Sequence, residues 1–213
     1  MNLLRIATRI IINTILEEIR DSCPSQLHEN IGKLIGSGYY GEVYEIDDKV
    51  LKIGIAKTKS DADIMISKLQ RLQSLNSILF AQIFDYGILC DIDLPNSKYM
   101  IKSGVAYFYL MEHLIPISSN DIKIISRTLN DLEDLSRKPN YEQLKKKYLW
   151  SKSRQYKRDG GIEDVDPLIK AASLWDNMIS SNLSHRDMHQ KNIMQNENGD
   201  YKFVDLESMN FVN

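Results

Sequence analysis

The segment that decides the fold is His185-Arg186-Asp187-Met188-His189-Gln190-Lys191-Asn192, and Asp205-Leu206-Glu207 follows a short distance beyond it. Asp187 and Asn192 stand five residues apart on what we predict to be a tight loop. Asp205 comes 13 residues after Asn192, at the end of a predicted hairpin. One carboxylate that accepts a proton and two oxygen donors that hold a metal ion form a set suited to phosphoryl transfer.

The metal is expected to be Mg²⁺, because the charge of a phosphoryl group in transit has to be neutralised. Mg²⁺ prefers hard oxygen ligands, usually one or two protein side chains together with phosphate and water. We therefore predict Asn192 and Asp205 as the metal ligands. Asp187 is left to accept or orient the proton of the attacking hydroxyl group, an effect of about 10²–10⁴-fold. His185 and Arg186 are predicted to hold the loop.

A second motif, G-x-G-x-x-G-x-V, lies far upstream at residues 36–43. Apolar residues alternate on both sides of its glycines, which predicts two strands joined by a turn. In a dinucleotide-binding fold the glycines separate a strand from a helix, so the strand that follows here favours a hairpin that covers phosphates. Glycines let the backbone approach a nucleotide, and Val43 is suited to packing over its base. The predicted nucleotide contacts in this motif are Gly36, Ser37, Gly38, Gly41 and Val43.

The first segment resembles the catalytic loop H-R-D-x-x-x-x-N of the protein-kinase-like superfamily, with Asp205 in the position of the D-F-G aspartate. The resemblance covers residues from about Ile31 to Glu207. It implies an α+β, two-lobed fold with a five-stranded antiparallel N-lobe sheet and a reduced helical C-lobe. It also implies ATP and Mg²⁺ as ligands, Lys52 as the strand lysine that contacts the α- and β-phosphates, and Met111-Glu112-His113 as the hinge that binds adenine.

This interpretation divides the chain into an N-terminal amphipathic helix at residues 1–25, an N-lobe at 26–113 and a C-lobe at 114–213. The further predicted elements are a helix at Thr58–Leu79, strands at Ile78–Gly87 and Val105–Met111, and helices at Asp121–Arg137, at Tyr141–Lys157 and from Asp166 onward. An N-cap is predicted at Ser119-Asn120-Asp121. The first of these helices is expected to bury its periodic apolar residues Ile64, Met65, Leu69, Leu72, Leu75 and Leu79.

Three features depart from the protein-kinase pattern. No glutamate occurs between Glu45 and Glu112, so the usual partner of the strand lysine is missing, and Asp61, Asp63, Gln70, Glu17 and Glu18 are the alternatives. No activation segment is expected after Glu207. His189 and Glu207 are similar to the H-x-D-x-H-x-x-N and D-x-E motifs of aminoglycoside and choline kinases, whereas Arg186 and the compact glycine loop are closer to protein kinases.

The leading hypothesis is an ATP- and Mg²⁺-dependent kinase that phosphorylates serine or threonine hydroxyls of a protein, with Asp187, Lys52 and His189 as its catalytic residues. One alternative is a small-molecule hydroxyl kinase whose substrate sits among the helices between Asp121 and Lys157. The other is a pseudokinase whose nucleotide pocket stabilises an interaction surface.

Composition narrows the partners and the compartment. The chain has 43% hydrophobic and 26% charged residues and a net charge of −2, so no nucleic-acid partner is expected. The basic residues at 145–147 and 152–158 are interpreted as a solvated helix face. Cys23 and Cys90 show no metal spacing, which favours a reducing compartment.

No uncharged stretch reaches the roughly 18 residues of a membrane span, so no transmembrane segment is expected. The first 20 residues are expected to pack on the domain or on a partner, and the alternatives are a membrane surface or a role in organelle targeting. The chain also resembles the minimal kinases of bacterial effectors and phages. This implies a cytoplasmic location, in the host cytosol for an effector or phage protein, and a protein partner that stabilises the chain.

Overall fold

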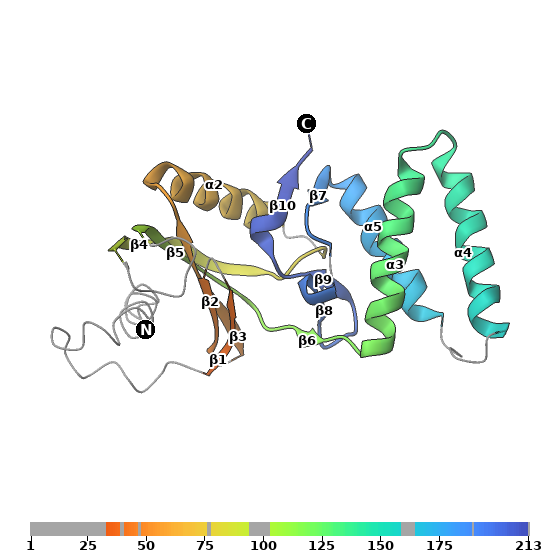
Figure 1. The fold of residues 1–213 in the computed structure, drawn as a ribbon, viewed down its shortest axis with the longest axis horizontal. Coiled ribbons are helices and arrows are strands. Elements are labelled where there is room, and N and C mark those ends of the chain that lie inside the picture. The colour runs from red at the N-terminus through yellow and green to blue at the C-terminus, as the bar shows by residue number, and fades with distance from the viewer. Residues whose placement is uncertain are drawn as a thin grey trace. The chain divides into compact units, whose positions relative to one another are not determined.

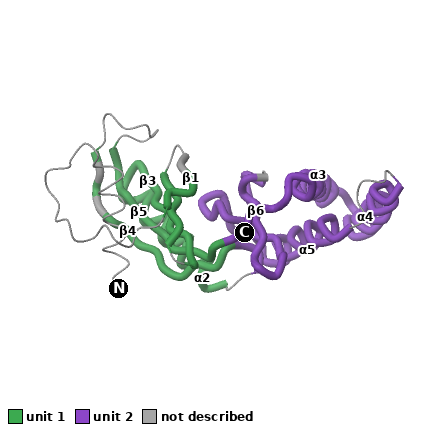
Figure 2. Tube along the Cα trace, turned by 90° about the horizontal axis from the view of Figure 1, so that it is seen from below, with its two compact units in different colours: residues 1–77, 81–113 green, residues 78–80, 114–213 purple. Residues whose placement is uncertain are grey.

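The computed structural model describes residues 33–38, 41–46, 48–75, 78–93, 103–158, 165–188 and 190–212. The chain forms two compact units, which are coloured separately in Figure 2. Unit 1 comprises the residues up to Ser77 together with Ala81–His113, and unit 2 comprises Ile78–Phe80 together with Leu114–Asn213. The amphipathic helix predicted at residues 1–25 lies outside the described residues.

Unit 1 is built on a five-stranded antiparallel sheet with the strand order β1-β2-β3-β5-β4 (Figure 1). Its strands are β1 (Leu34–Gly38), β2 (Gly41–Ile46), β3 (Lys49–Ala56), β4 (Ile83–Asp93) and β5 (Ser103–Glu112). The prediction of an α+β chain with a five-stranded antiparallel sheet is therefore confirmed, with four α-helices in the described residues.

Alternation of side chains fixes the register of this sheet. In β2 every second residue is buried, because successive side chains of a strand point to opposite faces. The apolar residues that gather on one face form a cluster of Tyr44, Ile46, Leu51, Ile53, Ala106, Phe108 and Leu110. A slip by one residue would turn this whole set to the opposite face of the sheet and break the cluster, so its packing holds the strands in register.

Helix α2 (Lys59–Leu75) covers part of the unit 1 sheet and packs on β3, β4 and β5. Thr58 opens it: its hydroxyl accepts from the Asp61 N–H at 3.1 Å and donates to the Asp61 carboxylate at 2.8 Å. Its fully buried residues are Ala62, Leu69 and Leu72. The predicted buried face was partly wrong, because Ile64 is 62% and Leu75 43% exposed.

The segment after α2 differs from the prediction of a helix to Leu79 and a strand from Ile78. The helix ends at Leu75, and β4 begins only at Ile83. Residues 78–80 belong instead to unit 2, where Phe80 forms a parallel bridge with Phe203 and the Leu79 carbonyl accepts from the Phe203 N–H at 2.9 Å. A long-range pairing therefore overrides the local pattern of apolar residues.

Unit 2 contains helices α3 (Ser119–Ser136), α4 (Tyr141–Arg158) and α5 (Asp166–Ser180) (Figure 1). Their bounds agree with the predicted ranges to within a few residues. The N-cap of α3 is Ser118 rather than the predicted 119–121 segment, since its hydroxyl accepts from the Asp121 N–H at 3.1 Å. Pro167 lies in the first turn of α5, where its missing N–H has no helical partner to lose.

Two small sheets complete unit 2. One joins β6 (Ile115–Pro116), β8 (Ile193–Gln195) and β9 (Tyr201–Phe203), and the other pairs β7 (Leu183–His185) with β10 (Met209–Phe211). Gly199 closes the β8–β9 hairpin with a φ of 78°, a value that favours glycine. Among the helices that the structure describes, none is both long enough and apolar enough to cross a membrane.

Candidate functional site

His185 is the centre of the predicted catalytic segment. It ends β7 with 4% exposure, and its ring stacks on Phe203 with centroids 4.6 Å apart. Its Nδ1 accepts from the Asp187 backbone N–H at 3.2 Å, and its Nε2 lies 3.1 Å from the Asp205 carbonyl oxygen. A neutral ring with the proton on Nε2 satisfies both contacts. One buried imidazole therefore ties the Asp187 loop to the Asp205 turn.

A second link joins Asp187 and Asn192. The Asn192 Nδ2 donates to the Asp187 carbonyl oxygen at 3.0 Å and to the Asp187 carboxylate at 3.2 Å. The short 3₁₀ turn at Gln190–Asn192 makes this return of the loop possible. On its other side, the Asn192 carbonyl oxygen accepts from the Val204 N–H at 3.1 Å, next to Asp205.

The Asp205-Leu206-Glu207 motif forms a 3₁₀ turn over Leu206–Ser208. Leu206 is fully buried, and this anchors the turn between the two carboxylates that flank it. The Ser208 hydroxyl donates to the Asp205 carboxylate at 2.6 Å, and the Ser208 carbonyl accepts from the Arg186 N–H at 3.0 Å. The structure thus brings Asp187, Asn192 and Asp205 together within unit 2.

The donor set at this cluster fits a Mg²⁺ ion. The Asn192 side chain directs its amide nitrogen to Asp187, and its carbonyl oxygen is the hard ligand that Mg²⁺ accepts. The Asp205 carboxylate is the group that would supply a second oxygen ligand. No group of three or more His, Cys, Asp or Glu residues suited to a metal occurs in the described residues. A Mg²⁺ site does not require one, because phosphate and water oxygens complete its shell.

Several of the predicted nucleotide residues of unit 1, among them Gly36, Val43 and Lys52, share one face of the sheet. Gly36 is paired with Val43, Val43 with Lys52, and Lys52 with Tyr109, and residues paired across neighbouring strands project to the same side. The Lys52 Nζ lies 5.8 Å from the centroid of the Tyr109 ring. Met111, two residues beyond Tyr109, projects to the same face and is 5% exposed.

The glycines of the hairpin differ in their surroundings. A methyl group on Gly41 would lie 1.9 Å from the Ile53 carbonyl oxygen, so β2 and β3 approach closely only because this side chain is absent. Among the residues that the structure describes, a methyl group on Gly36 would meet only Val43, at 3.7 Å. Ser37 and Gly38 end β1, paired with Glu42 and Gly41 respectively.

The predicted hinge begins where β5 ends. The Glu112 N–H donates to the Gln82 carbonyl oxygen at 2.8 Å, and the Glu112 carboxylate accepts from the Gln82 N–H at 3.0 Å. These bonds hold Glu112 against the start of β4, and His113 beyond it is exposed. The backbone of Met111 lies between Val50 and Ile83 in the sheet.

Two groups of predicted residues are not part of the described arrangement. His189 lies outside the residues that the structure describes, as do Glu17 and Glu18. Of the other candidates for the missing helix glutamate, Asp61 caps the first turn of α2. Asp63 and Gln70 are exposed on the same helix.

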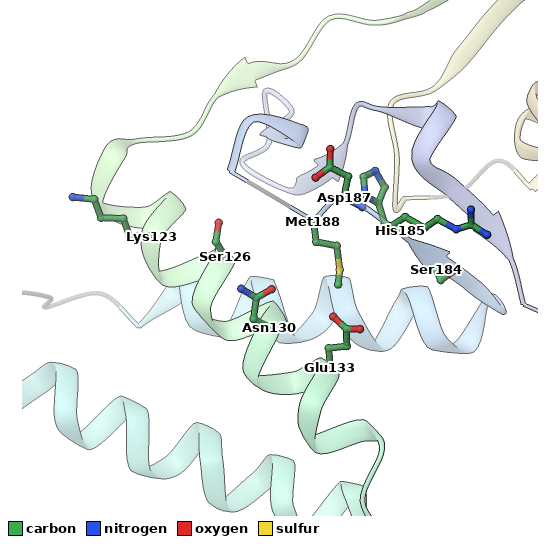
Figure 3. Close-up of a pocket in the computed structure, with 9 residues that line it drawn as sticks. Lys123, Ser126, Asn130, Glu133, Ser184, His185, Asp187 and Met188 are labelled. Carbon is green, nitrogen blue, oxygen red and sulfur yellow. Dashed lines mark hydrogen bonds between the residues drawn. The ribbon is translucent and has the colours of Figure 1, made fainter. Parts of the chain in front are cut away.

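An open pocket of about 770 Å³ adjoins Asp187 within unit 2. One wall is a polar row along α3, and the other is the loop that carries Asp187 and Met188 (Figure 3). The row consists of Lys123, Ser126, Asn130 and Glu133, which share one face of the helix by their spacing. The Ser126 hydroxyl is buried and makes no hydrogen bond within the described part of the chain.

Comparison with known proteins adds no family. No protein-family model matches the chain, and no curated protein matches it significantly. The geometry of the two units therefore carries the functional argument.

Sequence reasoning missed three members of the site. Ser208 holds Asp205 through a hydrogen bond inside one 3₁₀ turn. Phe203 holds His185 through a ring contact that depends on the return of β9 beside the loop. The α3 row was included only as part of a broad helical region. The four residues of the row are spaced by three, four and three positions, which places them on one face of a helix. This spacing is the sequence signal that predicts a polar wall.

Proposed function

We propose that this chain is an ATP- and Mg²⁺-dependent phosphotransferase of protein-kinase-like, two-lobed fold, and that it transfers the γ-phosphoryl group to a hydroxyl. The observation that carries the proposal is the hydrogen-bonded cluster in unit 2, where His185 and Asn192 hold Asp187 beside Asp205. Proton acceptor and metal ligands are the parts that phosphoryl transfer requires.

In this proposal Asp187 accepts the proton of the acceptor hydroxyl as its oxygen bonds to the γ-phosphorus. The bond between that phosphorus and the β,γ-bridging oxygen breaks, and ADP leaves with the bridging oxygen. Asn192 and Asp205 would hold Mg²⁺, which neutralises charge on the phosphate oxygens when bound. His185 fixes the loop so that the Asp187 carboxylate keeps its position during transfer.

Unit 1 would hold the nucleotide. The face shared by Gly36, Val43 and Lys52 offers a backbone free of bulk, an apolar contact for the base and a cation for the phosphates. Met111-Glu112-His113 would contact the adenine edge through their backbone. We assign the role of the missing glutamate to none of the α2 candidates, because the side chains of Asp61, Asp63 and Gln70 are exposed to solvent.

The favoured acceptor is a serine or threonine hydroxyl of a protein. A second candidate, a small polar hydroxyl compound, is supported by the pocket beside Asp187. Its α3 wall carries a cation, a carboxylate and amide and hydroxyl groups, and the buried Ser126 hydroxyl would gain a hydrogen bond from a ligand there.

The first experiment measures the Tm with ATP, with Mg²⁺ and with both, in wild type and in Asp205→Ala. Ligand at 100 times its Kd should stabilise by about 2.7 kcal/mol, which shifts the Tm of a domain of this size by about 5–11 °C. The Mg²⁺-dependent part should disappear in Asp205→Ala and remain in Asp63→Ala, an exposed control on α2. No shift under any condition would refute the nucleotide site; a shift without any transfer would favour the pseudokinase.

The second experiment identifies the acceptor. Labelling with radioactive ATP is compared between a cell lysate and a panel of small hydroxyl compounds, and Asp187→Asn should lose at least 100-fold in either case. Ser126→Val should raise the KM of a small acceptor without changing ATP binding, and should leave labelling of a protein acceptor unchanged. Full labelling by Asp187→Asn would exclude the proposed role of this residue.

A further inference from the structure

Helix α4 divides its charges unevenly between its two faces. It carries seven of the chain's 27 Lys and Arg residues and one of its 29 Asp and Glu residues. On the inner face, Lys145 is buried and its Nζ contacts the Asp176 carboxylate at 2.9 Å and that of Glu142 at 3.0 Å. Together with Tyr148, which donates to Asp131 at 2.8 Å, this contact binds α4 to α5 and α3.

The outer face forms a continuous cationic stripe. Its members repeat every three or four residues and are all exposed: Lys146, Lys147, Trp150, Arg154, Lys157 and Arg158. Trp150 is 62% exposed at the middle of the stripe, and the Arg154 guanidinium lies 4.7 Å from the centroid of its ring. No acidic residue interrupts the stripe, so its charges add.

We infer that the outer face of α4 binds the surface of an anionic membrane. Clusters of four to eight Lys and Arg residues on a helix are attracted to acidic lipid headgroups. A tryptophan with one apolar ring face and a polar N–H belongs at the boundary between headgroups and acyl chains. The contact places α4 on the membrane without insertion of a spanning segment.

Two other polyanions fit the stripe less well. The remainder of the chain has an acidic excess, because most of its carboxylates lie outside α4, and an extended nucleic acid would be repelled there. A protein interface would need an apolar centre larger than one Trp150 ring, and lysine, which supplies three of the five cations, is depleted in such interfaces. An anionic lipid surface requires neither a basic surface on the rest of the chain nor a large apolar centre.

The test uses the full chain and vesicles of phosphatidylcholine with or without about 30% phosphatidylserine. The wild-type chain should sediment with the vesicles that contain phosphatidylserine and not with those that lack it. Higher salt should release the chain from the anionic vesicles. Lys147→Gln/Lys157→Gln should bind about 30-fold more weakly, from ~1 kcal/mol per cation. Lys57→Gln/Lys59→Gln, which removes the same charge from exposed positions in unit 1, should bind within twofold of wild type.

Tryptophan emission gives a second readout that does not depend on these variants. The chain has two tryptophans, and Trp175 is 5% exposed, so a blue shift on anionic vesicles reports Trp150. The shift should be absent in Trp150→Phe. Equal binding by both lysine variants, no sedimentation of wild type, or binding to duplex nucleic acid or an acidic protein without vesicle binding would each overturn the inference.

Discussion

Two glycines of the β1–β2 hairpin differ in the room that each leaves for a methyl group. Gly41→Ala would press its Cβ into the Ile53 carbonyl, whereas a Cβ on Gly36 would make ordinary contact with Val43 alone within the described part of the chain. We expect Gly41→Ala to destabilise by about 1–3 kcal/mol, the range for overpacking, and Gly36→Ala to keep the wild-type Tm.

The functional half of this prediction uses the same pair. Gly36→Ala should weaken ATP binding, because the added methyl lies on the face shared with Val43 and Lys52. Calorimetric titration with ATP and Mg²⁺ measures the Kd. A Gly36→Ala protein with unchanged Tm and unchanged ATP affinity would place the nucleotide elsewhere.

At the residue scale, spacing alone predicted which side chains would cluster at the C-terminal site. Asp187, Asn192 and Asp205 could be chosen because a short loop and a hairpin restrict where they can lie. Of their supports, Phe203 could not be chosen, since its ring meets His185 only once β9 lies beside β7, whereas the Ser208 hydroxyl reaches Asp205 within one short turn. A ring contact between residues far apart in the chain leaves no local signature in the sequence.

The start of α3 offers a test at the scale of one element. Ser118 accepts from the Asp121 N–H and donates to its carboxylate at 2.8 Å, whereas Ser119 is the first helical residue. Ser118→Ala should lower the free energy of unfolding by about 1 kcal/mol. Ser119→Ala is the matched control and should change it by less than about 0.5 kcal/mol. Urea titration compares the two, and equal losses would contradict the observed cap.

The packing of α4 against α3 and α5 should weaken at alkaline pH. Burial, followed by the negative charge of Asp176, raises the pKa of Tyr141 to about 12. Burial and the bond to Asp131 also raise the pKa of Tyr148. A raised folded pKa means that the folded chain holds the phenolic proton more tightly. The stability this gives is full below pH 10 and is lost as the pH rises through the folded pKa.

The measurement is the free energy of unfolding at pH 8, 10 and 11. The Tyr141→Phe/Tyr148→Phe double variant should be less stable at pH 8, by roughly 1 kcal/mol for the lost Asp131 bond. Its stability should fall less than that of wild type above pH 10, because it has no phenol to ionise at these positions. Parallel curves for both proteins would show that other groups control the alkaline limb.

At the element scale, periodicity located the helices and strands better than their ends or faces. The predicted range of α4 agreed closely with the observed one. The helical spacing around Ile64 was misleading, since α2 turns Ala62 rather than Ile64 toward the sheet. Small residues that let a helix approach a sheet carry little hydrophobic signal.

At the scale of the whole molecule, residues 78–80 allow a test of how independently the two units unfold. These residues belong to unit 2, although the residues before and after them in the sequence belong to unit 1. Phe80 is 1% exposed and pairs with Phe203. Phe80→Ala should remove about 3–5 kcal/mol of stability. Hydrogen exchange should accelerate at β9 and α5 in unit 2 more than at β3 and β5 in unit 1. A uniform acceleration would mean that the two units unfold together.

The pairing of residues 79 and 80 with Phe203 also has a consequence during synthesis, because Phe203 is translated much later. Leu79 and Phe80 leave the ribosome about 120 residues before Phe203, which at 5–20 residues per second is a delay of about 6–25 s. Throughout that interval the unit 1 sheet can form around them while their own partner does not yet exist. Nascent chains arrested before residue 203 should therefore crosslink to chaperones at this pair, and chains arrested well beyond it should not. The order of translation therefore leaves a hydrophobic site exposed on the nascent chain, and the folded protein buries this site.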